Sequence, residues 1–346
     1  EDIAVLYRTN AQSRVLEEAL RKSGIPYKIY GGLSFYQRKE IKDVIAYLRL
    51  IINPSDEEAL KRVINYPARG IGDTTQQKLL KVVHENPRVP ALEIIADPLK
   101  YGVDVKNAAA GKLQKFAELI NSFLDENEQQ DAYHVAERVV FASGIMADVS
   151  VDTTPENLAR KENIQEFLNA VHEFCDQKVN NGDNDIRLVN FLNEVSLITD
   201  QDTDKPEDKN TVTLMTVHAA KGLEFTNIYI VGMEENLFPS MMVESERGLE
   251  EERRLFYVAI TRAKERCMIT YAKSRFRNGQ TQFSNPSRFL YDIDKRYLRL
   301  PQDSAFGRGG IVDPYSMFDN AQCTMHNAQF SSRTHDRGEG LFKKKE

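Results

Sequence analysis

The feature that most constrains the fold is a long helical block between two stretches of alternating strands and helices. Apolar runs at 2–8 and 27–32 are typical of strands, and a helix-like segment follows each of them. From about residue 55 to 205 the apolar spacing is helical and strand signals are almost absent. Strand-like runs return at 211–217 and 226–233. Strand and helix in alternation predict a parallel sheet, so the sequence indicates an α/β domain interrupted by a mostly α-helical insert.

The expected boundaries lie where this pattern changes. Asn53-Pro54 stops the second helix, and the polar run "DQDTDKPEDKN" at 200–210 suits a returning linker. The last stretch has few apolar clusters, so we expect it to be loosely ordered. The predicted parts are an α/β domain at 1–54 and 206–295, a helical insert at 55–205, and a tail at 296–346.

Composition excludes few functions. The 346 residues, 41% hydrophobic and 28% charged, suffice for two or three globular domains. A net charge of -6 says little about DNA binding, because affinity for phosphates follows local basic patches. Cys175, Cys267 and Cys323 have no paired spacing for zinc or disulfides, which fits a reducing, cytoplasmic setting. No apolar run is long enough to span a bilayer. The start "EDIAVLYR", without Met, suggests a piece of a longer protein.

The run "TVHAAKGLEF" at 216–225 places a lysine and a glycine directly after a strand, as a nucleotide-binding loop does. A P-loop, however, needs G-x-x-x-x-G-K-[ST], and here Lys221 precedes Gly222. The Gly111-Lys112 pair lacks both the first glycine and the Ser or Thr of that motif. The chain therefore contains no P-loop.

His218, Lys221 and Glu224 in this run would lie at the carboxyl end of a strand. That edge of an open α/β sheet is where ligands bind. The same residues also fit an ordinary surface loop with a glycine turn.

The segment "RRLFYVAITRAKER" has the apolar spacing of a helix that extends to Arg266, followed by a strand "CMITYA". Arg262 would then project from a packed helix. Its guanidinium can donate to two oxygens of a terminal phosphate. A solvated helix face, with Arg262 paired to Glu265, is the alternative.

The segment "YPARGIGDTTQQKLLK" places two glycines before a helix, with Asp73 and Thr74 as candidate N-caps. Gly70 and Gly72 would let the backbone approach a phosphate, in the manner of a helix-hairpin-helix grip on duplex DNA. A plain glycine turn before a helix explains the same residues.

The segment "YRTNAQSR" ends the first strand. Tyr7, Arg8, Asn10 and Arg14 could there hold the phosphates and bases of a single strand. A polar turn that only caps the next helix is the alternative.

Six motifs, in their order along the chain, resemble the superfamily 1 DNA helicases of the UvrD, PcrA and Rep type. They are "YRTNAQSR", "GGLSFYQRKEIKD", "RGIG", "TVHAAKGLEF", "VGMEENLFPS" and "EEERRLFYVAITRAK". The resemblance covers about residues 1–295 and implies a RecA-like second motor domain with helices on both faces of its sheet and an inserted helical domain. In the family, a first motor domain carries the P-loop and the Mg²⁺-binding acidic motif, and it has no counterpart here.

The resemblance also implies roles for individual residues. Arg262 matches the arginine that contacts the γ-phosphate of ATP, and Glu224 matches the ribose contact. Gly222, in the same motif as Glu224, belongs to the implied nucleotide-binding site. The implied DNA contacts are Arg8, Asn10 and His218 for the single strand, and Gly70, Ile71, Gly72 and Thr74 for the duplex.

Two stretches leave a role open. Ser240 stands where some relatives have a DNA-contacting histidine. Packing explains Phe35, Arg38 and Glu40 as well as ligand binding does.

The implied function is that of the carboxyl-terminal half of an ATP-dependent, 3′ to 5′ DNA helicase in repair or replication. ATP with Mg²⁺ would be its cofactor, and single-stranded DNA, duplex DNA, the amino-terminal motor domain and repair or replication proteins its partners. The half alone should be inactive as an ATPase. The alternatives are a DNA-binding or partner-docking module without ATPase activity, and the motor part of a helicase-nuclease.

Overall fold

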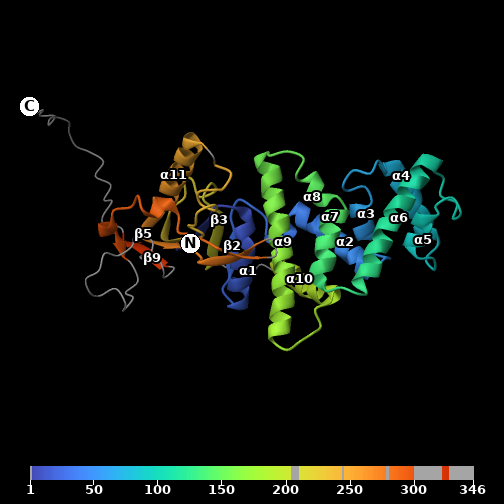
Figure 1. Ribbon diagram of the computed structural model, residues 1–346, viewed down its shortest axis with the longest axis horizontal. Helices are drawn as coiled ribbons and strands as arrows, with labels where there is room; N and C mark the ends of the chain where they lie inside the picture. Colours follow the sequence, from blue (N-terminus) through green and yellow to red (C-terminus); the bar gives the residue numbers. More distant parts are fainter. Residues whose placement is uncertain (1, 204–209, 244, 278–279, 300–321, 327–346) are drawn as a thin grey trace, which may run out of the picture. The chain divides into compact units, whose positions relative to one another are not determined.

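The computed structural model describes residues 2–203, 210–243, 245–277, 280–299 and 322–326 (Figure 1). The first half of the chain contains β1 (Ile3–Tyr7), α1 (Ser13–Lys22), β2 (Tyr27–Ile29), α2 (Lys39–Ile52), α3 (Glu57–Val63), α4 (Asp73–Glu85), α5 (Ala91–Ala96), α6 (Asn107–Asn127), α7 (Ala132–Ala142), α8 (Ile145–Asp148) and α9 (Pro155–Asn180). The second contains α10 (Leu188–Thr203), β3 (Val212–Thr216), β4 (Phe225–Ile230), α11 (Glu246–Ile260), β5 (Ala263–Thr270), β6 (Ser274–Arg277), β7 (Gln280–Phe283), β8 (Leu298–Arg299) and β9 (Gln322–His326).

Strands far apart in the sequence form one sheet. Its parallel part has the strand order β2-β3-β1-β4-β5, in which β1 and β4 are in register from Ile3 with Asn227 to Leu6 with Ile230. Helices surround this sheet. The predicted α/β class with an interrupted parallel sheet is therefore confirmed.

By contacts the chain divides into two compact units. The smaller unit holds residues 1–6, 220–273 and 285–346, and the larger holds 7–219 and 274–284. The domain boundaries expected at 54 and 206 stay predictions.

In the smaller unit, α11 packs against β4 and β5. Its buried side chains include Phe256 and Ala259, and the Phe256 ring is stacked on Phe289 with centroids 5.9 Å apart. Ser245 caps the helix, because its side chain accepts from the N–H of Gly248 at 3.1 Å. The helix is therefore fixed at its start and along one face.

The predicted tail contains two strands, β8 and β9, that the sequence analysis did not expect. Backbone pairing places β9 antiparallel to β5, and β8 antiparallel to β9. The rest of the predicted loose tail, at 300–321 and 327–346, lies outside the described residues.

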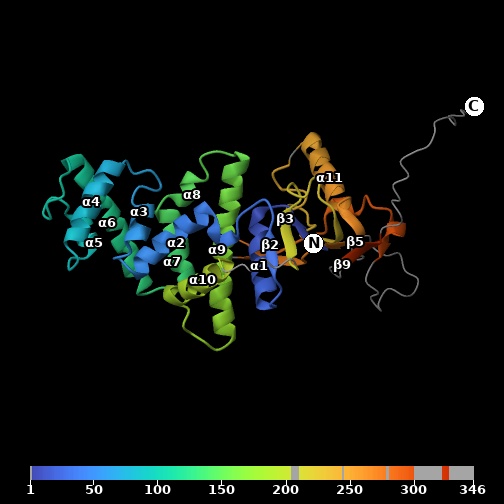
Figure 2. The same ribbon diagram turned by 180° about the vertical axis from the view of Figure 1, so that it is seen from behind.

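In the larger unit a helical core is built around α2, which packs on α3, α6, α7, α9 and α10. Between residues 55 and 203, all of which are described, there is no strand, as the apolar spacing predicted. α6 shows the pattern that makes this core, with apolar side chains buried on one face: Ala110, Leu113, Phe116, Ala117, Ile120 and Phe123. Figures 1 and 2, from opposite sides, show α4, α5 and α6 side by side in this unit.

No helix in the described ranges has the length and apolar character of a membrane span.

Candidate functional site

Arg262 is held by three hydrogen bonds in the smaller unit. Its Nε donates to the carbonyl of Val258 and Nη1 to the carbonyl of Leu223, both at 3.1 Å. Nη2 donates to Thr261 Oγ1 at 3.1 Å. A guanidinium has five N–H donors, so one N–H on each terminal nitrogen remains beyond these bonds. The side chain is thus fixed in place and can still donate to two oxygens of a ligand.

The same bonds bring Arg262 to the loop that precedes β4. Leu223, whose carbonyl it holds, directly precedes Glu224, and the N–H of Phe225 donates to the Arg262 carbonyl at 3.0 Å. Gly222 has φ +86, a conformation that favours glycine. Glu224 is exposed and Arg262 is half-buried. The structure therefore brings together the residues of the predicted nucleotide site.

The position of Arg262 corrects one expectation. The predicted helix was to continue to Arg266, but α11 ends at Ile260, Thr261 is its C-cap, and β5 begins at Ala263. Arg262 lies in the turn between them, and tethers to backbone carbonyls, not helix packing, orient it.

In the larger unit, the ends of β1 and β3 meet. The N–H of Val217 donates to the Tyr7 carbonyl at 2.9 Å, so Arg8 and His218 follow neighbouring strand ends. The turn after β1 is closed by Gln12, whose Oε1 accepts from the N–H of Arg8 at 3.0 Å. Arg8 is half-buried and His218 is exposed, and each has further interactions within the chain.

Asn10, the first residue of a 3-10 helix (Asn10–Gln12), is half-buried in the same turn. Arg8, Asn10 and His218 therefore share one edge of the sheet, as predicted for parallel strands.

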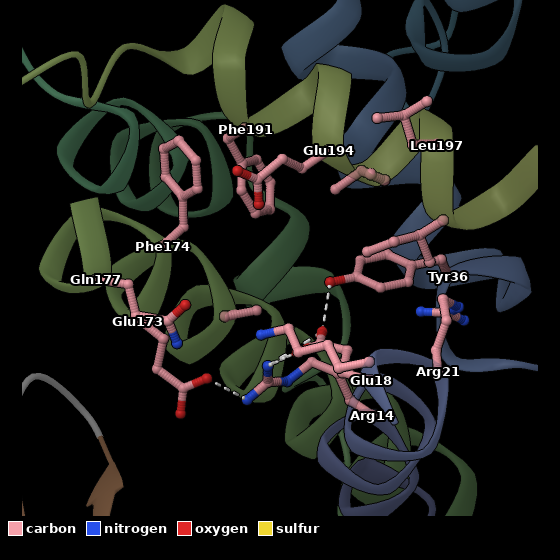
Figure 3. Close-up of a pocket in the computed structure, with 14 residues that line it drawn as sticks. Arg14, Glu18, Arg21, Tyr36, Glu173, Phe174, Gln177, Phe191, Glu194 and Leu197 are labelled. Atoms are coloured by element: carbon pink, nitrogen blue, oxygen red, sulfur yellow. Dashed lines mark hydrogen bonds and ion pairs between the residues drawn. The ribbon is translucent and has the colours of Figure 1, made fainter. Parts of the chain in front are cut away.

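Two other residues of that motif do not lie in an open site. Tyr7 is 1% exposed, and burial raises the pKa of its hydroxyl to about 12. Arg14 is 2% exposed, and its guanidinium contacts Glu166 at 2.7 Å. It also contacts Glu18 at 3.1 Å and Glu173 at 2.9 Å (Figure 3). Burial lowers the pKa of Arg14, but the three carboxylates outweigh it and raise the pKa overall. The suggestion that Tyr7 and Arg14 hold a single strand is wrong.

A cavity of about 260 Å³ lies beside Arg14, among α1, α9 and α10 (Figure 3). Tyr36 lines it and donates from its hydroxyl to Glu18 Oε1 at 3.1 Å. Arg14 is the one residue suggested for DNA binding that lines this cavity, among the described residues.

Packing accounts for the three residues whose role stayed open. Phe35 is fully buried, and Arg38 and Glu40 are each 8% exposed. Arg38 Nη2 donates to the Leu33 carbonyl at 3.1 Å, and Glu40 Oε1 accepts from Asn163 Nδ2 at 2.6 Å.

The glycine loop (residues 64–72) connects α3 to α4. Asn65 organises it, because its Oδ1 accepts from the N–H groups of Arg69 and Ile71, both at 3.0 Å. Ile71 is 1% exposed and anchors the loop in the core, so its side chain is not available to DNA. Gly70 has φ +69 and is exposed.

The start of α4 corrects a second expectation. Gly72, not Asp73 or Thr74, is the N-cap, and no side chain caps the helix. Thr74 lies exposed in the first turn. Gly72 and Thr74, on either side of Asp73, are therefore both exposed at the start of α4.

Sequence reasoning missed three residues that support these sites. Thr261 and Asn65 orient Arg262 and the glycine loop, and Lys112 on α6 donates from Nζ to the Gly70 carbonyl at 3.0 Å. Of the three, only Thr261 is next to its partner in the sequence, so the sequence alone could have suggested that contact.

Ser240 lines a second cavity, of about 270 Å³, in the smaller unit. Its hydroxyl accepts from the N–H of Met242 at 3.3 Å, and its own N–H donates to Glu252 at 3.4 Å. Among the described side chains no group of three or more His, Cys, Asp or Glu could hold a metal ion.

Comparison with known proteins gives a consistent result. The family model for the UvrD-like helicase C-terminal domain matches residues 1–274. A relative from Staphylococcus aureus (strain Mu50), named ATP-dependent DNA helicase PcrA, is 40% identical over 317 residues, which are 91% of this chain and 42% of the relative. A protein of the same name from Staphylococcus epidermidis (strain ATCC 35984) is 40% identical over 300 residues, 86% of this chain and 40% of the relative. The chain thus spans about two-fifths of the length of the curated relatives it matches.

Proposed function

Because this chain belongs to the UvrD-like helicase C-terminal domain family, we propose that it is the carboxyl-terminal motor half of an ATP-dependent DNA helicase. The whole protein would move along single-stranded DNA in the 3′ to 5′ direction and unwind duplex DNA, in repair or replication. The relatives' shared name, ATP-dependent DNA helicase, supports this proposal.

The observation that carries it is the tethering of Arg262 to the carbonyl of Leu223, next to Glu224. In this proposal Glu224 accepts from the ribose hydroxyls of ATP and Arg262 donates to the γ-phosphate. The two N–H groups that Arg262 has left fit two phosphate oxygens. Bound ATP with Mg²⁺ supplies the free energy of hydrolysis; the P-loop and the Mg²⁺ ligands would belong to an amino-terminal motor domain.

Single-stranded DNA would bind at the sheet edge formed by Arg8, Asn10 and His218. Donors at one edge can hold backbone phosphates. His218→Ala and Asn10→Ala should each weaken binding of a labelled single strand without ATP. If these variants bind the single strand normally but bind ATP poorly, this edge of the sheet binds the nucleotide, and the assignment to single-stranded DNA is wrong.

Duplex DNA would bind at the glycine loop through Gly70, Gly72 and Thr74, with Ile71 as the anchor of the loop in the core. Replacing Gly70 and Gly72 with valine should weaken duplex binding more than single-strand binding. Equal losses on both kinds of DNA would contradict the assignment.

The experiment that tests the motor function uses the whole protein and its DNA-stimulated ATP turnover. An arginine finger supplies about 10³ to 10⁵ in turnover, so Arg262→Ala should lower turnover by that range. Arg262→Lys keeps the positive charge but loses the forked pair of donors of the guanidinium. Its ATP turnover should therefore be almost as low as that of Arg262→Ala. Unchanged turnover in Arg262→Ala, with folding intact, would refute the motor function of this half. The chain alone should not hydrolyse ATP.

The partners in this proposal are single-stranded and duplex DNA, the amino-terminal motor domain of the same protein, and repair or replication proteins. A cytoplasmic location belongs to the same proposal.

A further inference from the structure

Lys112 lies against the glycine loop although it belongs to another helix. Its Nζ donates to the Gly70 carbonyl at 3.0 Å. A Cβ built on Gly70 would lie 2.4 Å from Lys112 Nζ and 3.4 Å from its Cε. The φ of +69 also favours glycine at this position. The Lys112 side chain therefore packs closely against the glycine loop at Gly70.

The charge of Lys112 is not balanced by a carboxylate in the described part of the chain. Its hydrogen bond goes to a neutral carbonyl, and no ion pair is formed with Asp73, the acidic residue at the start of α4. Lys78 on α4 differs, because its Nζ contacts Asp104 at 2.6 Å. Lys112 thus presents a full positive charge beside the loop.

Arg69, the cationic residue within the glycine loop, already forms hydrogen bonds within the protein. The Arg69 guanidinium donates to four backbone carbonyls and to the Tyr47 hydroxyl, which hold the loop to α2, α3 and the end of α7. Lys112, by contrast, is exposed, and two of its three N–H donors remain after the bond to Gly70.

We propose that Lys112 is a duplex-binding residue, whose ammonium, positioned by the Gly70 carbonyl, binds a DNA backbone phosphate at the glycine loop. The inference rests on the proposed duplex function of that loop and extends its site to α6. A lysine binds phosphate as a point charge and reads no base. Its contribution is therefore independent of DNA sequence and depends on salt.

The test compares Lys112→Met with Lys78→Met in the chain as it stands. Methionine keeps much of the apolar stem and removes the ammonium, and circular dichroism verifies that both variants fold. Fluorescence anisotropy measures binding to a labelled blunt-ended duplex and to a labelled single strand over a range of NaCl concentrations.

Lys112→Met should weaken duplex binding by about fivefold near 0.1 M salt. The slope of log K against log salt should decrease in magnitude by about 0.9, the value for one phosphate contact. Lys78→Met, whose charge Asp104 already balances, should leave both quantities nearly unchanged. Single-strand binding should not change in either variant. A purely structural role for Lys112 would not alter the salt slope.

Two outcomes would overturn the inference, and they can be told apart with Gly70→Val. If Lys112→Met keeps the native slope while Gly70→Val loses duplex binding, the loop binds DNA without the lysine. If both variants bind duplex like the native chain, the loop is not a duplex site and the proposed function of this region fails as well.

Discussion

Arg14 should be among the side chains on which the larger unit depends most. Its side chain is 2% exposed, and its guanidinium pairs with three carboxylates, those of Glu18, Glu166 and Glu173. These acidic groups come from α1 and α9, so the arginine joins two helices. Arg14→Met removes the cation and leaves the three carboxylates facing one another.

The magnitude follows from their burial. Breaking a buried ion pair costs about 3 to 5 kcal/mol, because a charge remains without a partner. Glu18 and Glu166 are 20% and 18% exposed, but Glu173 is 42% exposed and can turn to solvent. We therefore expect the lower end, about 3 kcal/mol of unfolding free energy. At about 2 to 4 °C per kcal/mol for a unit of this size, the midpoint should fall by about 6 to 12 °C.

Thermal and urea unfolding, followed by circular dichroism, measure this change. The matched control is Arg49→Met, because Arg49 also bridges two carboxylates, Asp56 and Glu58, but is 45% exposed. That variant should lose less than about 1 kcal/mol. If Arg14→Met were no less stable than Arg49→Met, the cluster would not stabilise the unit and the argument from burial would be wrong.

Three further predictions concern smaller features. Asn65→Ala removes the acceptor for two loop N–H groups, and urea unfolding should show a loss of about 1 to 3 kcal/mol. Ser245→Ala should destabilise α11 by about 1 kcal/mol and Ser245→Gly by only a few tenths, so equal losses would exclude a capping role. Burial raises the pKa of Cys175 to about 11 and of Cys267 to about 12, which keeps both thiols protonated at pH 8. With the third cysteine replaced by serine, DTNB should label the native chain slowly and the unfolded chain at once.

Where apolar spacing is regular, the sequence was a sufficient guide. The strands around Leu6 and Leu214 and the helix that buries Tyr47 all show it, and each was predicted. The start of β5 shows why the spacing can fail. Lys264, Glu265 and Arg266 are exposed strand residues without apolar alternation, so the stretch was predicted to extend the preceding helix.

The spacing of residues in the sequence could not predict which groups the charged residues contact. Arg14 was a candidate for binding a single strand, but it is paired with Glu166, 152 residues away. Lys112 was considered only as a failed P-loop lysine, and its contact to Gly70 spans 42 residues. A motif shows which residue types stand together in sequence, whereas burial of a charge depends on what the fold places opposite it.

Thr261 gives the sharpest test of how Arg262 is positioned. The Thr261 hydroxyl accepts from Arg262 Nη2 at 3.1 Å and is itself 3.0 Å from the carbonyls of Tyr257 and Val258. Thr261→Val keeps the shape and removes one of the three tethers, while Thr261→Ser keeps the hydroxyl. In the whole protein, Thr261→Val should lower kcat for ATP by about 2- to 12-fold, equivalent to about 0.5 to 1.5 kcal/mol, with little change in KM.

This split distinguishes positioning from binding. A tether that matters only when the γ-phosphate charge develops affects kcat, whereas a ground-state contact to ATP would raise KM. The kcat of Thr261→Ser should stay within about twofold of the native value, because serine keeps the hydroxyl that accepts from Arg262. If serine lowered kcat and valine did not, the methyl group and its packing would be responsible. Arg262 would then be held by the carbonyls of Leu223 and Val258 alone.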